Sequence, residues 1–188
     1  MHTEKVDAQD MIGATLIRSG DTQENISVTG YYTVECIGSD GEVKWTDGIE
    51  NLVVTEGKAK LFNVNFASGT PTTTWYLGLV EQIGAWVPDF AVTDTLASHG
   101  NGTSSGWAET TAYTGSRKTA SFTATATNSI SASAASFIIN ASITVAGAFL
   151  STVSSGTSGT LYSAGAFTGG NRTVVSGDTI NVTYTTSA

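Results

Sequence analysis

The feature that most limits how this chain can fold is a long stretch without charge. The 53 residues between Lys118 and Arg172 contain no Asp, Glu, Lys or Arg. The stretch is not a membrane span, because Ser, Thr, Asn and Gly interrupt every apolar run well before the roughly 20 residues that a transmembrane helix needs. Aromatic and branched apolar residues recur through it, which is not typical of disorder. We therefore expect short strands and turns there.

Almost all of the acidity lies elsewhere. Of the 16 acidic residues, 15 lie at or before Glu109, and the formal net charge is −8. Charged residues make up only 13% of the chain, about half the usual share, and this scarcity of Lys, Glu and Arg excludes a helix bundle or a coiled coil. No Lys or Arg cluster exists to bind nucleic acid phosphates. An uncharged stretch after an acidic first part predicts two surfaces with different neighbours.

β-Branched and aromatic runs, separated by Gly, Ser and Asp turns, predict the strands. We expect them at residues 31–37, 42–47, 72–80, 118–127, 132–141, 142–152, 160–167, 172–175 and 179–184. The first two form a hairpin, the run 72–80 lies in the middle of a sheet, and Ile180, Val182 and Tyr184 share one face. Thr55 caps a short helix whose Ala59, Leu61 and Phe62 pack under the sheet.

About eight or nine strands of this kind predict an all-β fold. The fold class that we expect is an antiparallel two-sheet sandwich, jelly-roll or immunoglobulin-like, in a single domain over residues 31–188. Residues 1–30 are polar and weakly patterned and are interpreted as an N-terminal arm. Residues 84–115 form one long loop excursion, which at that length is usually functional or part of an interface.

Catalytic patterns are weak. Asp94 and His99 lie in one short segment and are half of a hydrolytic triad, but none of the nearby serines sits in a Gly-x-Ser-x-Gly elbow. Two carboxylate pairs, Glu50 with Glu56 and Glu81 with Asp89, are candidates for glycosidase chemistry without a spacing argument to prefer either. We therefore expect a non-enzymatic protein with no catalytic residues.

Cofactor and metal patterns do not stand out. Cys36 lies in an apolar strand and is interpreted as a buried thiol, and the Cys/His cluster that zinc needs is missing from the sequence. Phosphate-binding loops, dinucleotide-binding glycines and Asp-rich calcium loops are also missing from the sequence. We expect neither a cofactor nor a metal.

Aromatic residues in the excursion are the candidate binding residues. Trp86 and Trp107 are expected to be exposed, as contacts to another subunit or to a glycan, since tryptophan is enriched in interface hot spots. Trp75, Tyr76 and Tyr113 could also line a carbohydrate site, but Trp75, in the apolar strand, is expected in the core.

Several segments, taken as an ordered set, resemble small virion proteins from the structural modules of tailed bacteriophages. They are residues 33–45, 51–58, 75–79, 94–99, 106–109, 146–150, 159–167 and 177–179, and the resemblance covers roughly residues 31–186. It implies a head decoration (cement) protein on the capsid surface of a virion, made in the host bacterial cytoplasm. Its implied partners are the major capsid protein and further copies of itself, as a homotrimer. Residues 1–30 depart from the pattern.

Two other functions stay open. A tail fibre, tip or adaptor protein also suits uncharged β segments, although such proteins usually show a repeat or a heptad stalk. A carbohydrate-binding sandwich that attaches the particle to host or mucosal glycans is the third hypothesis. On the decoration hypothesis, residues 119–171 face a symmetry mate, because an interface without charges avoids their desolvation cost.

Overall fold

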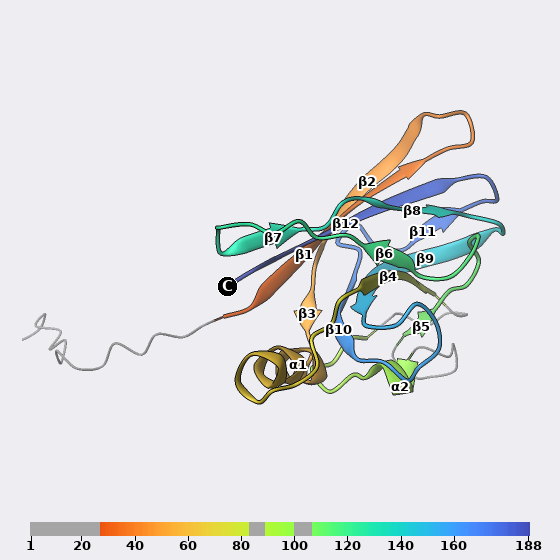
Figure 1. Ribbon diagram of the computed structural model, residues 1–188. Helices are drawn as coiled ribbons and strands as arrows, with labels where there is room; N and C mark the ends of the chain where they lie inside the picture. The colour runs from red at the N-terminus through yellow and green to blue at the C-terminus, as the bar shows by residue number, and fades with distance from the viewer. Residues whose placement is uncertain (1–26, 83–88, 100–106) are drawn as a thin grey trace, which may run out of the picture.

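Two antiparallel sheets pack face to face in the computed structural model, which describes residues 27–82, 89–99 and 107–188 (Figure 1). Sheet A contains β2 (Val43–Glu50), β1 (Thr29–Ile37) and β12 (Thr179–Ser187), with β7 (Ser129–Ser131) and β8 (Ala135–Ile138) in succession along the far side of β12. Sheet B contains β3 (Leu52–Val53), β10 (Leu161–Ala166), β9 (Ile143–Ser151), β4 (Trp75–Glu81), β5 (Ala108–Glu109), β6 (Lys118–Ala120) and β11 (Arg172–Val174). The expected all-β, two-sheet antiparallel sandwich is confirmed.

The centre of sheet A follows the alternation that the sequence predicts. β1 pairs with β12 along its whole length, placing Tyr32 opposite Tyr184 and Cys36 opposite Ile180. These four side chains are fully buried, because successive strand residues point to opposite faces and this set faces sheet B. The predicted shared face of β12 is confirmed, and the β1–β2 hairpin forms around Gly41 at φ +85°.

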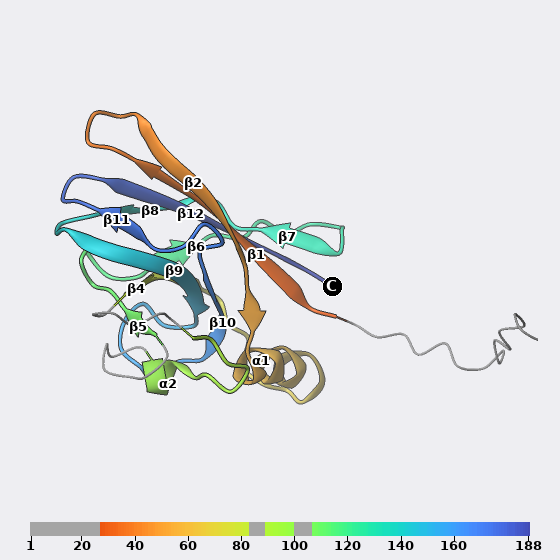
Figure 2. The ribbon, with the colours of Figure 1, turned by 180° about the vertical axis from the view of Figure 1, so that it is seen from behind.

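The central strands of sheet B are buried on both faces, which the sequence did not predict. One face meets sheet A in the main core, which includes Leu77, Leu79 and Leu150. The other face carries a second core with Phe149, Leu161 and Trp107, covered by residues 89–99 and Trp107. Figure 2 shows α2 (Leu96–His99) in this outer layer, whereas β5 extends sheet B beside β4. The long excursion thus includes a third layer of the sandwich.

Burial on both faces accounts for part of the charge-free stretch. Every residue of β9 from Val145 to Ser151 is buried, as are the first five residues of β10. A strand covered on both faces has no aqueous side for a charged group, so it is apolar or neutral throughout. These strands need no partner subunit to explain their composition. Residues 123–128, in contrast, are exposed and remain accessible to a neighbour.

The helix after β3 is longer than expected and faces differently. α1 (Thr55–Phe66) has Val54 as its N-cap and no side-chain cap, so the predicted capping role of Thr55 is wrong. Ala59 and Phe62 are exposed rather than packed under the sheet, while Leu61 contacts the main core. Close packing through a glycine on α1, described below, sets this rotation. Within the described ranges, neither helix has the length and apolarity that crossing a bilayer requires.

An ion pair ties the β1–β2 hairpin to the turn before β12. Lys44 Nζ lies 2.7 Å from Asp178 Oδ2, which also accepts a hydrogen bond from the Val175 N–H. Burial alone would raise the Asp178 pKa, but these two hydrogen bonds outweigh it and hold the pKa below its ordinary value of 3.8. The ionised carboxylate therefore stabilises the fold.

This pair makes stability fall in acid. Because the folded pKa of Asp178 lies below the unfolded one, its contribution is complete above the unfolded pKa and is lost as pH falls through the folded pKa, between about pH 5 and pH 2. We expect the free energy of unfolding of Asp178→Asn, measured with urea, to depend less on pH across that range than that of the parent chain. Lys44→Met should also reduce this pH dependence, because without the ammonium the folded pKa of Asp178 rises toward the unfolded one. Equal profiles for all three proteins would contradict the assignment.

Candidate functional site

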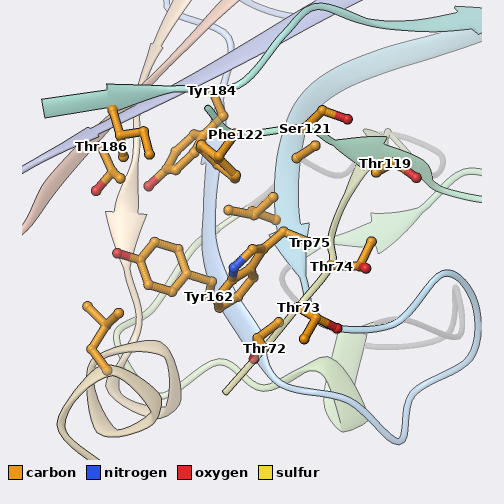
Figure 3. Close-up of a pocket in the computed structure, with 14 residues that line it drawn as sticks. Thr72, Thr73, Thr74, Trp75, Thr119, Ser121, Phe122, Tyr162, Tyr184 and Thr186 are labelled. Carbon is orange, nitrogen blue, oxygen red and sulfur yellow. The ribbon is translucent and has the colours of Figure 1, made fainter. Parts of the chain in front are cut away.

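A pocket of about 510 Å³ lies between the ends of the two sheets, beside α1 (Figure 3). Its walls come from both sheets and from the helix: Leu61, Thr72, Thr73, Thr74, Trp75, Thr119, Ala120, Ser121, Phe122, Ile130, Leu150, Tyr162, Tyr184 and Thr186. Exposed Thr73 and Thr119 place its rim at the surface, and buried Tyr162 and Tyr184 form its inner part. The volume is within the range of small-molecule sites.

Aromatic rings hold one another in place along the inner wall. The centroids of Trp75 and Tyr162 lie 5.2 Å apart at an interplanar angle of 67°. Tyr184 meets Tyr162 at 6.2 Å and Phe122 at 6.5 Å, both nearly perpendicular. Edge-to-face contacts of this kind are favourable beyond simple burial, so the wall is pre-arranged before a ligand enters.

The tyrosine hydroxyls remain protonated donors at neutral pH. Burial raises the pKa of Tyr162, and it raises the pKa of Tyr184 to about 12, although hydrogen bonds partly offset both shifts. The Asn51 side-chain amide donates to the Tyr184 hydroxyl at 3.1 Å. Gly30 leaves room for this contact, because a Cβ there would lie 2.1 Å from the same hydroxyl.

A second glycine positions the helix side of the pocket. A Cβ on Gly57 would lie 2.3 Å from the Tyr162 carbonyl oxygen, so only glycine lets α1 approach β10 this closely. Leu61 lies four residues later, on the same helix face, and lines the pocket. Glu56 fixes the first turn of α1, since its Oε1 accepts the backbone N–H groups of Leu96 and Leu161.

Of the two tryptophans expected as exposed contacts, Trp107 does not line this pocket. Trp107 is fully buried, so its expected exposure is wrong: its ring packs between Phe90 and Phe149 at centroid distances of 5.5 and 5.4 Å. The side chain fills the second core, which no pattern in the sequence predicts. Trp86 lies outside the described residues.

Trp75 contributes to the pocket, although the sequence favoured a core position for it. It was expected in the core, but it is half-buried and lines the pocket, because it is the first residue of β4 and lies where the two sheets end. The run of three threonines directly before it was the available signal, since polar residues at the start of an apolar strand place that start near the surface.

Asp94, which the sequence suggested as half of a hydrolytic pair, has a structural role. Its Oδ2 accepts hydrogen bonds from the Ala91 N–H at 2.9 Å and the Trp107 indole N–H at 3.0 Å. This buried carboxylate therefore holds the outer layer in place. His99 is the last residue of α2 and its side chain, like Ser104 and Ser105, lies outside the described part of the chain.

Glu56 and Cys36 also have structural roles, and Glu50 lies apart from Glu56. Glu56 accepts backbone N–H groups as described, whereas Glu50 is exposed and lines a different hollow on sheet A. Cys36 is buried as expected, and burial, with the charge of Asp178, raises its pKa to about 11, so the thiol is not a nucleophile. Across residues 27–82, 89–99 and 107–188, no three His, Cys, Asp or Glu side chains group as a metal site would require.

The aromatic pocket is therefore the candidate functional site, and its chemistry is that of binding. Its lining side chains supply apolar faces and neutral hydroxyls, and none of them carries a charge. Neither a scan against protein-family models nor a search of curated proteins finds a match to this chain.

Proposed function

We propose that this chain is a non-enzymatic structural protein of a tailed-phage virion that decorates the capsid and stabilises contacts between major capsid subunits. The resemblance of its ordered segments to small virion proteins supports the assignment to a particle. An exposed aromatic patch on α1 supports the role in assembly. The proposal also includes self-association as a homotrimer, because decoration proteins commonly occupy local three-fold axes.

The observation that carries the proposal is an exposed aromatic patch on α1, made of Phe62 and Phe66. Phe62 is 59% exposed and Phe66 is 83% exposed, and their ring centroids lie only 6.2 Å apart. The opposite face of the same helix is fixed against β10 through Gly57. Two adjacent exposed rings on a rigidly held helix are typical of a protein contact.

The copy number per particle tests the assignment to the head. We expect quantitative mass spectrometry of purified virions to find hundreds of copies, and light scattering of the isolated chain to give the mass of a trimer. A dozen copies or fewer would favour the tail. A stable monomer that does not bind capsids would overturn the proposal.

Removing the patch should weaken docking without unfolding the sandwich. We expect the double variant Phe62→Ser, Phe66→Ser to bind capsids at least about tenfold more weakly, because exposed aromatic anchors dominate interface energies. Its melting temperature should stay within a few degrees of the parent, as both rings face solvent. Co-sedimentation with undecorated capsids measures the effect.

The matched control is Val175→Ser, which removes an exposed apolar side chain, 43% exposed, in the turn before β12. It should bind capsids like the parent chain. Equal binding by the double variant and the parent would show that α1 is not the docking surface.

A further inference from the structure

The aromatic pocket has a chemical composition that limits what it can hold. Of its 14 lining residues, eight carry a hydroxyl group and none is charged. The hydroxyl residues are Thr72, Thr73, Thr74, Thr119, Ser121, Tyr162, Tyr184 and Thr186. A hydrocarbon site does not need so many hydroxyls, and a site for an anion or a cation needs an opposite charge. The lining fits a neutral ligand that has both apolar faces and many hydroxyl groups.

Several of these polar groups make no hydrogen bond within the described part of the protein. Within the described ranges, the side-chain hydroxyls of Thr72, Thr73, Thr74, Thr119 and Ser121 make no hydrogen bond with the protein, and neither does the Trp75 indole N–H. Each hydroxyl can both donate and accept. In Figure 3 the Trp75 side chain lies between the threonines and Ser121 on one side and Tyr162, Tyr184 and Thr186 on the other. Donors and acceptors thus surround an aromatic centre.

We propose that this pocket binds a neutral pyranose ring, as part of a glycan. A C–H face of the sugar contacts the half-buried ring of Trp75, which the buried Tyr162 ring supports at an angle of 67°. The sugar hydroxyls pair with the threonine and serine hydroxyls at the rim. The site does not depend on the proposed role at the capsid.

The tryptophan indole signals provide a residue-specific test. The chain has 4 Trp residues, and a nitrogen–proton correlation spectrum of the full chain shows their side-chain N–H groups separately. The probes are methyl glycosides of glucose, galactose and mannose, N-acetylglucosamine, and the trisaccharides maltotriose and chitotriose. We expect at least one probe to give a saturable shift of the Trp75 indole signal, with a roughly millimolar Kd, as is usual for one small polar ring. Glucuronate, which is charged, should bind more weakly than glucose.

Conservative variants separate binding from folding. Trp75→Phe keeps an aromatic ring, and the indole signal that disappears from its spectrum is the signal of Trp75. This variant should bind the sugar at least about tenfold more weakly, as measured by saturation transfer to the sugar protons. Thr119→Val removes one exposed rim hydroxyl at constant shape and should weaken binding several-fold. Matched controls are Thr33→Val, an exposed strand threonine on sheet A, and Trp45→Phe, which packs against Phe167 away from the pocket. Both should bind like the parent.

Three results would overturn the proposal. The first is that no neutral sugar gives a saturable shift. The second is that cyclohexanol binds the pocket while the sugars do not, which would make it an apolar docking site. The third is that sugars bind equally well to Trp75→Phe and Thr119→Val, which would place the sugar elsewhere. The Phe62→Ser, Phe66→Ser variant should bind sugar like the parent chain. The proposal of a sugar site and the proposal of a capsid contact are therefore tested independently.

Discussion

Replacing Arg117 by methionine should lower the free energy of unfolding by about 3–5 kcal/mol, because it leaves a buried carboxylate without its partner. The Arg117 side chain is 1% exposed and that of Glu109 is 7% exposed. Arg117 Nε donates to Glu109 Oε1 at 2.8 Å, and Nη2 donates to the second carboxylate oxygen. The guanidinium also lies 5.1 Å from the centroid of the Phe149 ring.

The same guanidinium closes the loop between β9 and β10. It donates to the carbonyl oxygens of Val153 at 3.1 Å and Gly156 at 2.9 Å, and Gly156 has φ +71°. Loss of Arg117 therefore removes the loop's anchors together with the ion pair. Urea unfolding followed by circular dichroism at neutral pH measures the change.

Two comparisons show whether the charge is responsible. Lys118→Met, which alters the neighbouring and more exposed cation, should change stability by less than about 1 kcal/mol. The double variant Arg117→Met, Glu109→Met should recover part of the loss, since no buried charge is then left unpaired. A double variant less stable than Arg117→Met alone would contradict this account.

Most strands were predictable because their signals are local, but of the strand expected at residues 118–127 only β6 (Lys118–Ala120) forms. β1, β4, β9 and β12 each carry an alternating or continuous apolar run, and the turns between strands contain glycines. β7 was missed because its three residues, Ser129–Ser131, lie in a segment rich in Ser, Thr and Ala with little contrast. Its pairing with the end of β12 is a long-range choice that no local pattern encodes.

The pocket was not predictable for a related reason. Its lining residues come from separate segments between Leu61 and Thr186, and strand register decides which of them meet. Trp75 reaches the pocket because β4 begins opposite Ala120 of β6. The orientation of α1 depends on Gly57, which sequence reasoning did not single out. Sequence patterns indicated the strands, but contacts between distant residues made the site.

The outer layer shows the same limit at Trp107. This residue follows a Gly- and Ser-rich run, which is typical of an exposed loop. Its contacts, however, are Asp94, 13 residues earlier, and Phe149 on the central strand of sheet B. An aromatic residue in a loop is buried when the adjacent sheet has an uncovered apolar face, and sheet B has such a face through Ala146 and Phe149.

Replacing Trp107 by alanine should therefore cost about 3–5 kcal/mol of stability, the usual range for removing a large buried aromatic side chain. The variant loses the contacts with Phe90 and Phe149 and leaves Asp94 without the indole donor. Since Trp107 joins the outer layer to sheet B, the chain should also become sensitive to proteolysis near residues 89–99. Urea unfolding and limited proteolysis measure the two effects.

The size of the loss separates a core residue from a surface contact. Trp107→Phe keeps a ring in the second core but removes the indole N–H, so it should lose about half as much stability as the alanine variant. Phe66→Ala, at a ring that is 83% exposed, is the matched control and should change stability by less than about 0.5 kcal/mol. If Trp107→Ala were as mild as Phe66→Ala, the outer layer would contribute little to the fold, and the excursion would be a loop after all. We expect instead that the alanine variant unfolds at clearly lower urea concentration, because residues 89–99 and Trp107 complete the burial of the central strands of sheet B.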